Sequence, residues 1–253
     1  MNTAIPYSAA AIKQANRRLY DAVADRYEGL DGRRDETLLR WIRGILGELA
    51  LKHGNGILLD LGTGSGVVIR AADQLFRRSL AMDISPRMLA TLNAPTNERI
   101  AADVDAIPLR DNSVDVIACF AVLHHLPGSS RLAGEVVRVL RPGGVFWSDH
   151  DIELEFCRRY RGPLKLYRSL RAAKSKYSGQ QSDLETSVYE AAECRENGVD
   201  AVETVRDFQA AGLETLATYH WFGLARWSNR LFGTKPRRRG HAPLLRITAT
   251  KPN

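Results

Sequence analysis

The sequence has few cysteines and no long apolar run. Its three cysteines, Cys119, Cys157 and Cys194, lie far apart without CxxC spacing, which argues against a disulfide framework and against a metal site held by cysteine. No stretch reaches the roughly 18 consecutive apolar residues of a membrane span, and the first residues lack the apolar block of a secretory signal. We therefore expect a soluble, cytoplasmic protein.

Acidic residues are scarce in the last part of the chain. Residues 1–151 hold 18 Lys or Arg and 18 Asp or Glu, whereas residues 152–253 hold 18 Lys or Arg and 11 Asp or Glu, so the net charge of +7 comes from the second part alone. A one-sided excess of this kind favours an anionic partner or surface, with simple solubility as the alternative.

Short apolar runs alternate with segments of helical spacing. The runs that predict strands are 56–61, 79–82, 114–122, 145–148, 213–220 and 244–250. Helical spacing covers 8–50, 67–76, 132–140 and 201–211. Strand and helix units that alternate in this way favour a doubly wound parallel sheet, whose ligand sites lie at the carboxyl ends of the strands.

A glycine-dense turn follows the first of these strands. Residues 58–61 run into Gly62-Thr63-Gly64-Ser65-Gly66, and glycines there allow positive φ and a close approach to a ligand. Asp83 ends the next strand, where its carboxylate is placed to accept both hydroxyls of a ribose. The two features predict a pocket for an adenosine-type nucleoside. Val67 stands where the dinucleotide-binding fingerprint needs glycine, which argues against a nicotinamide or flavin site. No Gly-Lys-Ser/Thr follows the turn, which excludes a P-loop.

Further segments extend this pattern along the chain. They are Tyr20-Asp21, Ala24–Tyr27, Asp60–Gly66, Asp83, Ala102–Leu109 with Asp111–Asp115, Leu123–Pro127 and Val139–Gly144. In this order and spacing they resemble the class I S-adenosylmethionine (SAM) dependent methyltransferases, in the branch that includes the ubiquinone and menaquinone biosynthesis enzymes. The resemblance implies the α/β class I methyltransferase fold. That fold is a doubly wound, Rossmann-like, seven-stranded sheet, here with N-terminal helices and a helical insertion after the fifth strand.

We expect one methyltransferase domain over residues 1–253. Within it, residues 1–50 form an N-terminal helical cap and residues 51–151 the SAM-binding core. Residues 152–200 form a basic helical insertion or lid, and residues 201–253 complete the sheet and carry an aromatic and basic segment.

The resemblance also implies SAM as cofactor, S-adenosylhomocysteine as product, and a set of cofactor-binding residues. Asp60 orients the SAM amino group, Asp83 holds the ribose, and Asp103 accepts from the adenine amino group. The whole set is Tyr27, Asp60, Gly62, Thr63, Gly64, Gly66, Asp83, Ile84, Asp103, Val104, Phe120 and Ala121.

Methyl transfer needs mainly alignment, but a phenol or enol acceptor also needs a base, for which histidine suits best. The candidates are His124 and His125 after the fourth strand, then Asp149 and His150 after the fifth. One of the two adjacent histidines is expected to pack or cap instead, because successive side chains point apart. Asp149 to Asp151 suggests a metal site as an alternative, but we expect no bound metal.

The basic part of the chain indicates which class of molecule accepts the methyl group. Residues 158–176 hold eight Lys or Arg and no acid, and residues 221–239 combine large aromatics with arginines. Such segments favour a wall for a lipophilic or anionic small molecule, or contact with a membrane surface. We expect O- or C-methylation of a small aromatic or lipid-like acceptor. The alternatives are an RNA methyltransferase that grips phosphates with the basic half, and a SAM-binding module without catalysis.

Overall fold

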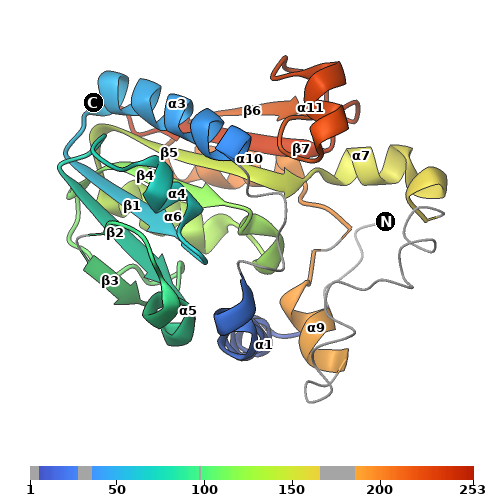
Figure 1. Ribbon diagram of the computed structural model, residues 1–253, viewed down its shortest axis with the longest axis horizontal. Helices are drawn as coiled ribbons and strands as arrows, with labels where there is room; N and C mark the ends of the chain where they lie inside the picture. The colour runs from blue at the N-terminus through green and yellow to red at the C-terminus, as the bar shows by residue number, and fades with distance from the viewer. Residues whose placement is uncertain (1–5, 28–35, 97, 166–185, 196) are drawn as a thin grey trace.

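The computed structural model describes residues 6–27, 36–96, 98–165, 186–195 and 197–253. A seven-stranded sheet in the order β3-β2-β1-β4-β5-β7-β6 forms its centre (Figure 1). The strands are β1 (Ile57–Leu61), β2 (Arg78–Asp83), β3 (Glu98–Ala101), β4 (Val114–Phe120), β5 (Leu140–Ile152), β6 (Glu214–His220) and β7 (Leu244–Thr250). The first five are mutually parallel, and β7 runs antiparallel to both β5 and β6.

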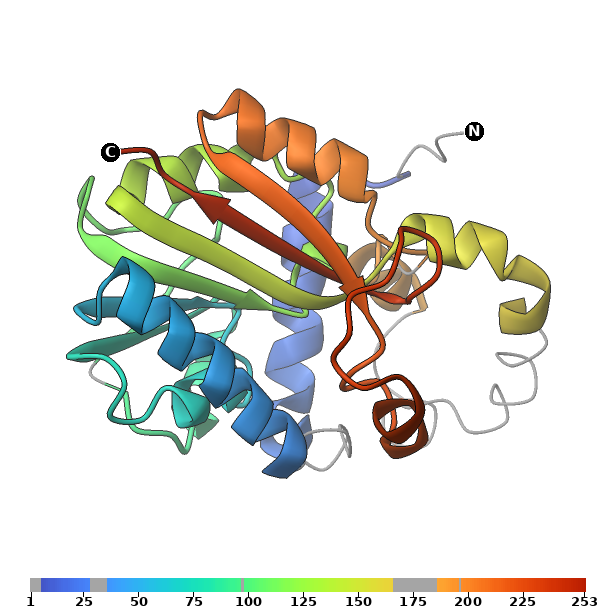
Figure 2. The same cartoon turned by 90° about the horizontal axis from the view of Figure 1, so that it is seen from above.

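Helices cover both faces of the sheet (Figure 2). On one face lie α3 (Glu36–His53) and α4 (Val67–Ala71), and on the other lie α6 (Ser130–Val139) and α10 (Ala201–Ala210). The apolar residues Leu38, Ile42 and Leu46 of α3 recur every fourth position and are buried, as expected for a helix that packs one stripe on a sheet. The two layers form the core that fixes the strand ends.

A second group of helices lies at the carboxyl ends of the parallel strands (Figure 1). There α1 (Ala9–Val23) and α9 (Thr186–Ala192) pack together through Leu19, Val23 and Val188. The remaining elements are η1 (Ala24–Arg26), α5 (Pro86–Thr91), η2 (Leu123–His125), α7 (Leu154–Arg159) and α11 (Arg226–Phe232). None of the helices in the described ranges is both long and apolar enough to cross a membrane.

Three elements differ from the sequence expectation. The helix expected over 67–76 ends at Ala71, because Gln74 adopts a left-handed φ of 61° and the chain turns there to enter β2. The strand expected over 145–148 extends over Leu140–Ile152 and includes Pro142. β3 was not predicted, because its four residues are exposed or half-buried and form no apolar run.

Residues 166–185 lie outside the described part, so most of the basic tract 158–176 and a large part of the insertion 152–200 are not covered by it. The division of the chain into four regions stays a prediction.

Candidate active site

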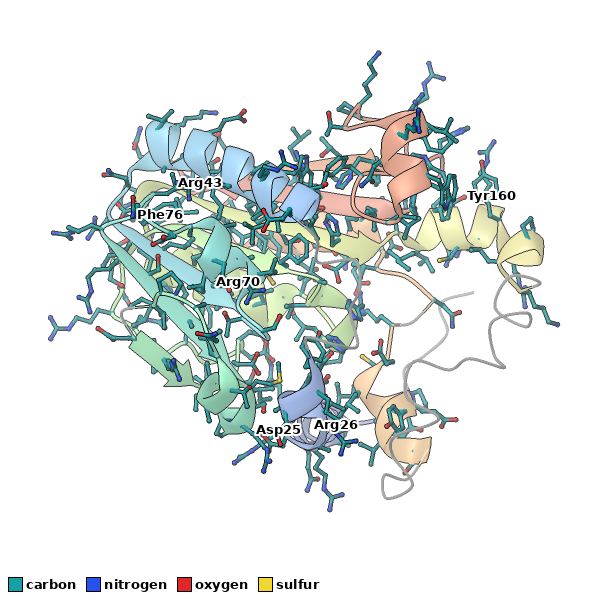
Figure 3. The ribbon with its side chains drawn as sticks, viewed as in Figure 1. Asp25, Arg26, Arg43, Arg70, Phe76 and Tyr160 are labelled. Carbon is teal, nitrogen blue, oxygen red and sulfur yellow. The ribbon has the colours of Figure 1, made fainter. Side chains whose placement is uncertain are left out.

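The turn after β1 brings backbone into a pocket at the strand ends. Gly62 adopts a φ of 65°, and a Cβ there would lie 2.5 Å from Cγ2 of Val122, so only glycine fits. The Asp60 carboxylate accepts a hydrogen bond from the Thr63 hydroxyl at 2.7 Å. Arg70 of α4 donates to the Ser65 carbonyl at 2.7 Å and braces the turn (Figure 3).

Asp83 ends β2 and lines the same pocket. Its Oδ2 accepts from the Gly64 backbone N–H at 3.0 Å and its Oδ1 from the Ser85 N–H at 2.9 Å. Burial raises the pKa of Asp83 despite these donors. The two backbone hydrogen bonds fix the carboxyl plane beside the glycine turn, where a ribose diol would bind.

Lys13 of α1 also lines the pocket. Its Nζ lies 2.6 Å from Asp103 Oδ2 and 2.6 Å from Asp105 Oδ2. Desolvation lowers the pKa of Lys13, but the two carboxylates outweigh it and the net pKa is raised. The ion pairs thus tie α1 to the loop after β3. Lys13 was not predicted as a site residue, because its partners lie some ninety positions away and no local pattern marks it.

An apolar wall follows the end of β4. Phe120, Ala121 and Val122 line the pocket there. Ala121 adopts a φ of 57°, and its N–H donates to the Asp149 carbonyl at 2.8 Å. A left-handed residue that is not glycine is strained, and such residues gather at functional sites.

A tyrosine and a histidine pair in the pocket. The His125 Nδ1 lies 2.9 Å from the Ala192 carbonyl oxygen, which only accepts, so Nδ1 carries the proton. Nε2 is therefore the acceptor for the Tyr20 hydroxyl at 2.8 Å. Burial, helped by the neighbouring His124, lowers the pKa of His125 to about 4. His125 is hence neutral at neutral pH, with its Nε2 lone pair directed at Tyr20.

His124 points the other way. Its Nδ1 and its backbone N–H both lie against Asp151 Oδ1, at 2.7 and 3.0 Å, and its Nε2 lies 3.8 Å from Glu193. Asp151 is completely buried. Of the two adjacent histidines, His125 lines the described pocket and His124 does not, and the assignment of a base to either stays a prediction.

Buried Asp149 and half-buried His150 form a separate cluster beside Phe120. Asp149 Oδ1 accepts from His150 Nδ1 at 2.9 Å and His220 Nε2 at 2.8 Å, and its Oδ2 accepts from Arg246 Nε at 2.7 Å. Desolvation opposes ionisation, but the two histidines hold the pKa of Asp149 well below its usual range. The His150 ring lies 4.3 Å from the Phe120 ring. A carboxylate so fully paired positions its neighbours and is a poor base.

Two sets of side chains in the described ranges bring candidate ligand atoms within 4.8 Å of one another, namely His124, His125 and Glu193, and Asp149, His150 and His220. In the second set the Asp149 oxygens already accept from His150, His220 and Arg246. The expectation of no bound metal stays a prediction.

The predicted cofactor residues divide into wall and support. The wall contains Tyr27, Gly62, Gly64, Asp83, Ile84, Asp103, Val104, Phe120 and Ala121. Asp60, Thr63 and Gly66 lie in the strand and turn that carry this wall. Wall residues that were predicted neither as cofactor residues nor as bases are Lys13, Asn16, Tyr20, Val122 and Leu126.

Part of the sequence is similar to known methyltransferases. Residues 59–148 match the family model described as "Methyltransferase domain". The chain is 33% identical over 140 residues to an uncharacterized chloroplastic methyltransferase of Arabidopsis thaliana, across 49% of this chain and 38% of that protein. It is 29% identical over 167 residues to a Mycolicibacterium smegmatis protein named "Probable S-adenosylmethionine-dependent methyltransferase", across 64% of this chain and 59% of that protein. The chain thus spans between about a third and three fifths of the length of these relatives.

The solved structures agree on the fold. A SAM-dependent methyltransferase from Thermotoga maritima superposes with a TM-score of 0.56 at 16% identity, covering 92% of this chain and 99% of that one. The sheet order and flanking helices are those of the class I methyltransferase fold. Residues 59–148 therefore match a methyltransferase domain by sequence, and the chain has the class I methyltransferase fold.

Proposed function

We propose that the chain is a SAM-dependent methyltransferase that methylates an oxygen or carbon atom of a small aromatic or lipid-like acceptor, as in the quinone-biosynthesis branch. The observation that carries the proposal is the Tyr20 and His125 pair. It lies in the same pocket as Asp83 and Gly64, so a proton acceptor and a nucleoside site share one cavity.

The pocket residues fit SAM. The buried Asp83 carboxyl lies beside a turn whose Gly64 approaches the Tyr27 ring, because a Cβ on Gly64 would lie 3.5 Å from Tyr27 Cε1. Such a position suits a ribose and a methionyl chain held against bare backbone. Ile84 and Val104 offer apolar contact to the adenine ring. Asp103 would accept from the adenine amino group beside the Lys13 ammonium.

SAM supplies an electrophilic sulfonium methyl, and in-line attack by the acceptor needs little covalent help from the protein. Alignment of two bound reactants is worth on the order of 7–11 kcal/mol. The remaining task of the protein is to remove a proton from the acceptor. As an acceptor oxygen bonds the methyl carbon, its own proton becomes strongly acidic, so even a weak base takes it.

The Tyr20 and His125 pair suits this task. The acceptor proton passes to the Tyr20 oxygen while the Tyr20 proton passes to His125 Nε2, which leaves Tyr20 neutral and His125 protonated. The low pKa of His125 keeps that side chain neutral until then, so it does not repel the cationic cofactor before transfer.

The test uses the full chain with SAM that carries a labelled methyl group, offered small-molecule, lipid and RNA fractions. We expect label in a small molecule or lipid. The His125→Gln variant should lower kcat about a hundredfold, the usual scale for a lost general base, with SAM affinity unchanged. The control is His241→Gln, at an exposed position. Label in RNA alone would contradict the proposed class of acceptor. Full activity of the His125→Gln variant would contradict the role of His125 as proton acceptor.

A further inference from the structure

An aromatic row joins two helices that are distant in the sequence. Ring centroids lie 4.7 Å apart from Tyr160 to Phe156, 5.4 Å from Phe156 to Trp221, 4.8 Å from Trp221 to Phe232 and 6.4 Å from Phe232 to Trp227. The row therefore runs from the end of α7 to α11. Both helices lie at one end of the molecule, with Tyr160 on the side toward α11 (Figure 3).

The outer end of this row is exposed and apolar. On α11, Trp227 is 58% exposed and Leu231 is 70% exposed. The two residues are four positions apart, so they share one helix face. A large exposed aromatic beside an exposed leucine is costly in water and is typical of a surface that enters an apolar phase.

Positive charge surrounds that face. No Asp or Glu follows Glu214, while eight Lys or Arg do. Lys235, Arg237 and Arg238 are exposed, and the Arg237 guanidinium lies 5.8 Å from the Phe232 ring centroid. On α7 and just after it, the exposed cations are Arg158, Arg159, Arg161 and Lys165.

We propose that this α7–α11 surface, formed by Tyr160, Trp227, Leu231 and the seven cations just named, docks the protein on a negatively charged phospholipid bilayer. Aromatic rings and a leucine enter the interface while arginine and lysine reach anionic headgroups. A nucleic acid would use the cations and an aromatic face but offers nothing for Leu231 to enter, so the bilayer accounts for more of the surface.

The loop that leads into α11 reaches the pocket wall through His150. The loop between β6 and α11 packs on the cluster around His150, since Phe222 lies 5.0 Å from Trp41 and a Cβ on Gly223 would lie 2.0 Å from His150 Nε2. His150 in turn stacks on Phe120 of the pocket wall. Docking would therefore bring the bilayer toward Phe120, in the wall of the pocket where the proposed acceptor would bind. This step alone rests on the proposed function.

The experiment measures co-sedimentation of the full chain with vesicles, without any turnover, so its result is independent of catalysis. Vesicles of phosphatidylcholine alone are compared with an equal mixture of phosphatidylcholine and phosphatidylglycerol. We expect binding to the anionic vesicles that weakens at high salt, and at least tenfold weaker binding to neutral ones.

Two variants with matched controls locate the surface. Trp227→Ser with Leu231→Ser should lower the affinity for anionic vesicles at least tenfold, whereas Leu51→Ser, at a 90% exposed leucine of α3 at the opposite end, should not. The triple change Lys235→Glu, Arg237→Glu and Arg238→Glu should abolish binding. A control with the same change in charge, Lys52→Glu, Arg77→Glu and Arg110→Glu at the amino ends of the strands, should retain most of it.

Folding of each variant is checked by its thermal unfolding midpoint. Equal loss in the surface and control triples would mean that net charge alone attracts the protein, which overturns the proposal. Absence of wild-type sedimentation with anionic vesicles would overturn it as well, and so would retention of RNA by the wild type without any vesicle binding.

Discussion

At the scale of single residues, His125 shows how far a position in the sequence predicts a role in the proposed site. Its place after a buried strand made it a candidate base, yet so did that of His124. Only the tertiary contacts separate the two, because the Ala192 carbonyl and the Tyr20 hydroxyl orient one ring while Asp151 orients the other. Those partners lie in other segments of the chain, so no local sequence pattern predicts them.

The titration of His125 predicts how stability depends on pH. Its folded pKa of about 4 lies below the ordinary 6.5, so between these values the unfolded chain binds a proton that the folded chain does not. The stability present above pH 6.5 is therefore lost as the pH falls toward 4, by about 3 kcal/mol for this group.

Urea unfolding between pH 7 and pH 4 checks the sign and size of this effect. The His125→Gln variant should lose much of the pH slope over this interval. His241→Gln, which changes an exposed histidine, should keep the wild-type slope. A slope in His125→Gln as steep as in the wild type would contradict the assignment of the buried neutral histidine.

At the scale of elements, the turn between β1 and α4 was predicted correctly from its glycines and from the strand before it. The length of α4 was not, because helical spacing continues past Ala71 while the backbone already turns at Gln74. β3 was missed because an exposed edge strand buries too little apolar surface to leave a pattern. Elements that are buried on both faces, such as β4, are the ones the sequence predicts well.

Gly62→Ala tests the close contact in that turn. The new methyl carbon would lie 2.5 Å from Val122 Cγ2, and alanine would have to adopt the positive φ of Gly62. We therefore expect a destabilisation of about 1–3 kcal/mol and weaker SAM binding. The matched control is Gly134→Ala in α6, where nothing lies within 4 Å of the new Cβ, and which should stabilise the fold by about 0.5–1 kcal/mol.

Thermal unfolding and SAM titration on the two alanine variants give the comparison. If Gly62→Ala matched the control in both stability and affinity, the turn would not approach the cofactor in the way described.

At the scale of the whole molecule, the resemblance predicts the doubly wound, seven-stranded sheet that the structure contains, and the placement of a nucleoside site at the carboxyl ends of its strands stays a prediction. The joining of α7 to α11 by the aromatic row was not predicted. Phe156 and Trp221 meet only because β5 and β6 both end at the same side of the sheet. The ion pairs of Lys13 with Asp103 and Asp105 likewise join α1 to a loop that is distant in the sequence. Long-range contacts of this kind need the folded chain.

The most direct test of the central claim is calorimetric titration of the full chain with SAM and S-adenosylhomocysteine, using the wild type, Asp83→Ala and the exposed control Asp73→Ala. We expect micromolar binding by the wild type and the control, and at least tenfold weaker binding by Asp83→Ala, which corresponds to about 1.4 kcal/mol. A folded wild type that binds neither molecule, or an Asp83→Ala variant that binds as tightly as the wild type, would contradict the assignment of this pocket as the cofactor site.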